Sequence, residues 1–161
     1  MTNEDVMRIS LSQSAIDLGC KAEDFLSDKN VIVPFSLSEN AKRYYKMPIS
    51  ANFVSYGNNV VASATAEIFD IVKEYIDKFE FYHCFESPNM KWLNDRLSPF
   101  GQTVCFMAEY YLPDVNKITG LSSNCAKNWE MRVLEKADFA SLYLPQWSKG
   151  HCDGFDFTAF A

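Results

Sequence analysis

The residues best suited to acid–base chemistry are Glu109 and Tyr111, two positions apart in the apolar run 102–112. Alternate side chains of a β-strand share a face, so Cys105 and Met107 are expected beside them. A carboxylate and a phenol facing one amine could act as general base and general acid in its acylation, because an ammonium must lose a proton before it attacks. Glu109 and Tyr111 are therefore our candidate catalytic residues. The alternative is a half-buried strand whose Glu109 is solvated or paired.

Two other groups of reactive side chains do not form a site by this reasoning. His83 and Cys84 are adjacent in a strand-like run, and adjacent strand residues point to opposite faces, so they cannot share a proton. His151, Cys152 and Asp153 offer metal ligands, but the sequence has no second Cys or His cluster to complete a tetrahedral site. We therefore predict neither a thiol nucleophile nor a metal site.

Hydrophobic periodicity predicts alternating strands and helices around these residues. The first helix spans 4–18, with Asn3 as its cap, Gly19 as its terminator and a buried stripe of Met7, Leu11, Ala15 and Leu18. The other expected helices are 38–46, 66–79, 87–97 and 137–144. Thr65 is the expected cap of 66–79 and Ser87 that of 87–97. Glu74 and Lys78 are expected to pair on the exposed side of 66–79. The expected strands are 31–35, 52–56, 60–64, 81–85, 102–112 and 130–134, the second and third forming a hairpin around Gly57.

These elements predict an α/β (α+β) fold with a mixed, largely antiparallel sheet flanked by helices. The expected organisation is an N-terminal α/β domain over 1–113, a linker or exposed loop over 114–129, and a strand, a helix and an irregular tail over 130–161. Residues 104–110 are expected to exchange their amide hydrogens slowly, and residues 130–161 are expected to be the least stable part, with fast exchange across 131–144.

Composition excludes several classes of protein. A content of 48% hydrophobic and 15% aromatic residues predicts a folded chain. No apolar run approaches the roughly 20 residues of a membrane-spanning helix, and the acidic start of the chain is unlike a secretory signal, so we expect a cytoplasmic protein. A net charge of -6 disfavours nucleic acid as a partner. Five cysteines, an odd number without a C-x-x-C pair, indicate reduced thiols, and Cys84 and Cys105 are expected to be buried.

Four stretches carry a resemblance to two-part bacterial N-acetyltransferases of the GNAT superfamily. Residues 53–64 (FVSYGNNVVASA), 83–88 (HCFESP) and 106–114 (FMAEYYLPD) resemble the N-terminal part of these enzymes. Residues 131–147 (MRVLEKADFASLYLPQW) are similar to the strand and helix that open their catalytic core. The resemblance implies a GNAT-like fold, apparently truncated at its C-terminus, with residues 130–161 as the start of an incomplete core.

The resemblance also implies transfer of an acetyl group from acetyl-CoA to an amine. In that family an Arg/Gln-x-x-Gly-x-Gly/Ala loop holds the pyrophosphate, and no such loop occurs in this sequence. We therefore expect no cofactor to bind this chain, which would be inactive alone, and a second copy or a partner protein to cover residues 130–161. The alternative is a non-catalytic small-molecule-binding or protein-interaction module.

Overall fold

The computed structural model describes residues 1–42 and 49–117. The chain divides between Pro113 and Asp114 into two units, Met1–Pro113 and Asp114–Ala161. The second unit is described only as far as Lys117. The strand and helix expected at 130–134 and 137–144 therefore lie outside the described residues, as do His151, Cys152 and Asp153.

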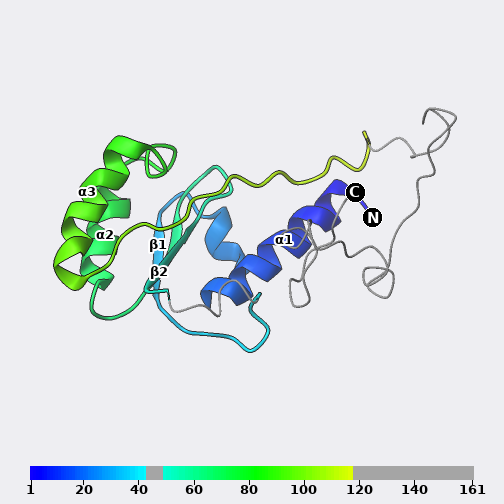
Figure 1. Ribbon diagram of the computed structural model, residues 1–161. Coiled ribbons are helices and arrows are strands. Elements are labelled where there is room, and N and C mark those ends of the chain that lie inside the picture. The colour runs from blue at the N-terminus through cyan, green and yellow to red at the C-terminus, as the bar shows by residue number, and fades with distance from the viewer. Residues whose placement is uncertain (43–48, 118–161) are drawn as a thin grey trace, which may run out of the picture. The chain divides into compact units, whose positions relative to one another are not determined.

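A three-stranded mixed sheet forms the centre of this unit. Its strands are β1 (Val31–Pro34), β2 (Ala51–Val54) and β3 (Val61–Ala64), in the spatial order β1-β3-β2. Strand β1 pairs with β3 in parallel, and β2 pairs with β3 antiparallel as the other arm of the expected hairpin. Helices cover both faces of the sheet (Figure 1), and the small side chains of β3 are all fully buried. The expected mixed α/β architecture is confirmed, with one parallel and one antiparallel pairing.

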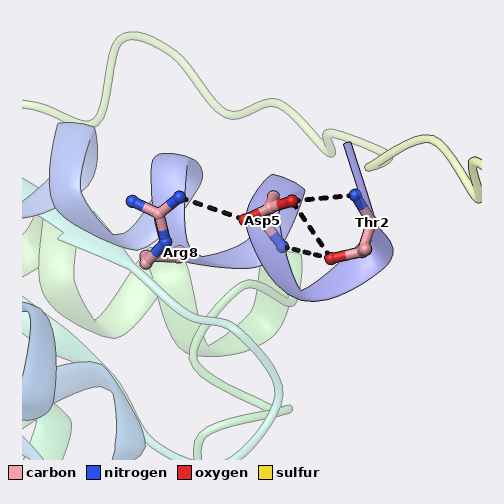
Figure 2. Close-up of polar contacts among 3 residues, drawn as sticks. All are labelled: Thr2, Asp5 and Arg8. Atoms are coloured by element: carbon pink, nitrogen blue, oxygen red, sulfur yellow. Dashed lines mark hydrogen bonds and ion pairs between the residues drawn. The ribbon is translucent and has the colours of Figure 1, made fainter.

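Helix α1 (Asn3–Leu18) covers one face of the sheet, and its first residues are held by a capping box (Figure 2). Asp5 N donates to Thr2 Oγ1 over 3.1 Å, and Thr2 N donates to Asp5 Oδ2 over 3.0 Å. The cap is therefore Thr2 and not Asn3 as expected, because only Thr2 places its oxygen before the first free N–H groups. Gly19 ends the helix at a φ of 72°, as predicted.

The buried stripe of α1 begins at Val6, one position earlier than predicted. Val6, Leu11, Ala15 and Leu18 are buried, whereas Met7 is 40% exposed. Leu11, Ala15 and Leu18 pack with Phe25 of the short 3-10 helix η1 (Ala22–Leu26) and with Val61 of β3. This cluster is the smaller of two cores, one on each face of the sheet.

Helices α2 (Phe69–Lys78) and α3 (Ser87–Leu97) build the larger core on the opposite face. Val72, Tyr75 and Ile76 of α2 pack with Leu93 and Leu97 of α3 against Val60, Ala62 and Ala64. Both helices were predicted, but their expected caps were wrong, since neither Thr65 nor Ser87 occupies the N-cap position. The expected Glu74–Lys78 pair is also replaced, because Glu74 accepts from Arg96 of α3 over 3.2 Å.

Two predicted strands are wrong. Residues 81–85 form a turn in which the N–H groups of His83 and Cys84 both donate to Glu80 O, at 2.8 and 3.2 Å, so they are not available to a sheet. Residues 102–112 form no strand, because alternation alone cannot make one without a neighbour for its backbone groups. Of the helix expected at 38–46, residues 38–42 are not helical and the rest lies outside the described residues.

Buried polar side chains fix the loops around the sheet. Asn59, fully buried, donates to Asp24 O and Lys29 O, both at 2.8 Å, and Asn30 Oδ1 accepts from Val60 N at 2.8 Å. Asp17 accepts from Gln13 and from the backbone N–H of Lys42, both at 2.9 Å.

In the part of the chain described, no helix combines the length and the apolar composition needed to cross a bilayer.

Candidate functional site

Glu109 and Tyr111 lie on an extended segment that leaves the fold after the short helix η3 (Ser98–Phe100). Gly101 reverses the chain at a φ of 68°, and Asn94 of α3 then holds the start of the segment. Asn94 Oδ1 accepts from Val104 N at 2.7 Å and from Thr103 Oγ1 at 3.0 Å. Val104 still packs against the larger core. Beyond it the chain runs on without becoming a strand (Figure 1).

The two candidate catalytic residues are both exposed in the described part of the chain. The neighbouring Glu109 carboxylate raises the pKa of the Tyr111 phenol. A phenol with a raised pKa is a poorer proton donor at neutral pH, and Tyr111 is 82% exposed. The pair therefore lacks the enclosed surroundings in which an acid and a base usually act.

The exposed side chains of this segment are mainly large and apolar. We define the docking segment as residues 104–112; its exposed apolar members are Phe106, Met107, Tyr110, Tyr111 and Leu112. Cys105 is exposed too and not buried as predicted, because the strand expected at 102–112 does not form. A cluster of exposed apolar side chains of this kind is typical of a surface that binds another protein.

His83 and Cys84 have separate partners and form no catalytic dyad. His83 Nδ1 lies 2.8 Å from Glu86 Oε2, whereas the Cys84 thiol donates to Phe79 O over 3.6 Å. Cys84 is buried as expected, and burial raises the pKa of its thiol to about 11. A thiol with that pKa is almost wholly protonated near neutral pH and is a poor nucleophile. Cys20, Cys84 and Cys105, the described cysteines, are all free thiols.

An open depression of about 540 Å³ lies between the loop after η1 and the end of α2. Asp28, Asp77, Glu80 and Lys29 contribute its charged groups. Asp77 is already paired with Lys73 of the same helix. Within residues 1–42 and 49–117, no group of three or more His, Cys, Asp or Glu side chains could hold a metal ion. The depression therefore offers neither a nucleophile with a base nor a metal centre.

The N-termini of the described helices are poorly suited to a pyrophosphate. An anion at a helix start needs free N–H groups and no competing negative charge. The capping box of α1 occupies such groups with Thr2 and Asp5, α2 has Asp70 in its first turn, and Glu86 precedes α3. The fold therefore places a carboxylate at each of these positions.

No protein family, curated protein or solved structure matches this chain.

Sequence reasoning missed the polar residues that hold the candidate segment and the loops in place. Asn94 lies in the helix predicted at 87–97, and its role depends on the turn at Gly101. Asn58 and Asn59 follow Gly57 in the predicted hairpin, and their side chains donate to the backbone around η1. The one available signal is the pair Asn58-Asn59 itself, because a buried Asn is uncommon unless its amide is hydrogen bonded, and the buried Asn59 donates two such bonds.

Proposed function

We propose that this chain is a GNAT-related acetyltransferase family protein whose auxiliary N-terminal domain recognises a partner and does not transfer an acetyl group by itself. The proposal rests on the four stretches at 53–64, 83–88, 106–114 and 131–147 that resemble the family. The exposed positions of Glu109 and Tyr111 support the part of the proposal that the chain does not transfer an acetyl group by itself. Acetyl-CoA would belong to the complete family protein.

The chemistry of amine acetylation explains why this observation matters. The acceptor must lose a proton next to a bound thioester, so the base has to face both substrates in one enclosed site. Glu109 and Tyr111 interact with each other on the docking segment, and the depression between the loop after η1 and the end of α2 includes neither of them among its lining residues. Recognition is therefore the role that the geometry supports better than catalysis.

Titration calorimetry of the whole chain with acetyl-CoA tests the proposal. We expect no binding heat beyond that of dilution, and no acetylation of a panel of primary amines under the same conditions. A dissociation constant at or below about 100 μM, equivalent to about 5.5 kcal/mol, would show that another part of the chain holds the cofactor. Acetyl transfer by the purified chain would contradict the proposal outright.

A second candidate function is that of a protein-interaction module without any acetyltransferase ancestry. The exposed apolar side chains of the docking segment favour it. Both candidates assign recognition to residues 1–113, so they differ in descent and agree that the chain alone does not catalyse the transfer.

A further inference from the structure

Asp17 carries a carboxylate that is almost completely buried in the last turn of α1, where its side chain is 1% exposed. The oxygen Oδ1 accepts hydrogen bonds from Gln13 Nε2 and from Lys42 N, both at 2.9 Å. The other oxygen, Oδ2, has no hydrogen-bond partner among the described residues and lies 3.5 Å from Lys42 Nζ. Lys42 therefore faces this carboxylate with both its backbone N–H group and its ammonium group.

The position of Asp17 makes its negative charge unfavourable unless a cation lies nearby. Removing a carboxylate from water is costly when the charge is not paired. The C-terminal end of a helix adds to this cost, because its free carbonyl groups carry partial negative charge. The last turn of α1 contains no basic residue that could offset it. The cation beside Asp17 comes instead from Lys42, 25 residues further along the chain.

Segment 38–42 lies against α1 through these contacts. Gln13 Nε2 also donates to Asn40 O over 3.4 Å, and Ala41 is buried. We propose that Lys42 and Asp17 form an ionic lock that holds segment 38–42 against α1, and that loss of the Lys42 charge releases the segment. The inference does not depend on the recognition role proposed above, because neither residue belongs to the docking segment.

The two charges of the ionic lock differ in the cost of leaving one of them unpaired. The Lys42 side chain is 56% exposed, so water solvates its ammonium group when the Asp17 charge is removed. A buried carboxylate without its cation is strongly destabilising. Neutralising Lys42 should therefore free segment 38–42, whereas neutralising Asp17 alone should not. Lys91 pairs with Asp95, whose side chain is 63% exposed, so this pair is the matched control.

Acylation of the Lys42 Nζ atom is a covalent modification that removes this charge. The ammonium group first loses a proton to water. The free amine then attacks the carbonyl carbon of an acyl thioester, so a C–N bond forms while the C–S bond breaks and the thiolate leaves. The product is a neutral amide at Lys42, and Asp17 is left without its cation.

Incorporation of Nε-acetyl-lysine in place of Lys42 in the whole chain tests the ionic lock directly. Amide hydrogen exchange, followed by nuclear magnetic resonance, reports on the N–H groups of Ala41 and Lys42, which donate to Ser38 O and Asp17 Oδ1. We expect both to exchange about 10-fold faster or more than in the unmodified chain, because local opening becomes easier. Nε-acetyl-lysine in place of Lys91 should leave both rates within about 2-fold.

Removal of both charges separates the effect of charge from that of packing. Lys42→Met alone should raise the exchange rate of the Ala41 amide about 10-fold, and Asp17→Asn alone should change it by less than about 3-fold. The double variant should return to within about 3-fold of the unmodified chain, because no unpaired carboxylate remains.

Three results would overturn the inference. The first is unchanged exchange in the chain with Nε-acetyl-lysine in place of Lys42. The second is a double variant as fast as Lys42→Met, because the packing of the Lys42 side chain and not its charge would then hold the segment. The third is an equal loss of protection at 61–64, which would mean that the pair supports the whole fold. Each of them leaves the acetyl-CoA titration unaffected.

Discussion

Replacing Tyr75 by Phe tests the centre of the larger core, because it removes one oxygen and keeps the ring. The Tyr75 hydroxyl donates to the carbonyl of Cys84 over 2.6 Å in a buried position. The ring packs against Phe53, Phe79 and Trp92 at centroid distances of 6.0, 5.2 and 5.9 Å, and Phe retains these contacts. The effect of the substitution is therefore the effect of one hydrogen bond.

The expected loss of stability is about 1–3 kcal/mol, the usual effect of leaving a buried carbonyl without its donor. At roughly 4 °C per kcal/mol for a unit of this size, the midpoint of thermal unfolding should fall by about 4–12 °C. Urea unfolding followed by circular dichroism measures the free energy. Tyr75→Ala should lose about 3–5 kcal/mol, because the ring contacts go too.

Tyr82→Phe is the matched control for this experiment. Tyr82 is 53% exposed, and its hydroxyl interacts with Glu80 at the surface, so its removal should change the free energy of unfolding by less than about 0.5 kcal/mol. If both variants unfold within about 0.5 kcal/mol of the unmodified chain, the bond between Tyr75 and Cys84 does not stabilise the fold, and the account of the turn at 81–85 fails.

Three further predictions concern the helix start and the thiols. Thr2→Ala, which removes the capping oxygen shown in Figure 2, should lower the free energy of unfolding by about 0.5–1 kcal/mol, and Thr2→Ser should restore most of it in the same urea titration. Burial raises the pKa of the Cys84 thiol from 9.0 to about 11, so between these values the folded chain keeps a proton that the unfolded chain loses. The contribution of this proton to the free energy of unfolding is complete below pH 9 and is lost as the pH rises through about 11. Urea titrations at pH 8 and pH 11 should show this decline, and Cys84→Ala should reduce it. In the native protein at pH 8, an alkylating reagent should modify Cys105 much faster than Cys84, and comparable rates would mean that Cys105 is covered.

The sequence predicts the elements whose signal is local. Gly19 ends α1 at a positive φ, the residues around Gly57 join β2 to β3, and the apolar periodicity of 66–79 matches the buried side of α2. Each of these signals depends on residues within one or two turns of chain. Local chemistry is therefore enough to place these elements.

The sequence fails where a structure depends on distant partners. Residues 81–85 and 102–112 have the composition of strands, but the first is held in a turn by Tyr75 and Glu80, and the second has no neighbouring strand in the described fold. The same limit applies to the candidate site. Alternation predicts Glu109 and Tyr111 on one face, yet whether such a face lies in a pocket depends on the rest of the fold, and the structure leaves both residues exposed.

Hydrogen exchange across the docking segment tests the central claim most directly, because the sequence pattern predicts slow exchange over 104–110 and the structure predicts fast exchange. At a protein concentration low enough to keep the chain monomeric, the amides of residues 107–112 should exchange at nearly the rate of an unfolded peptide. Those of 61–64 and 72–76 should be protected by a factor of roughly 10³ or more. Equal protection of 107–112 and 61–64 would mean that the segment is a covered strand, and would contradict its recognition role.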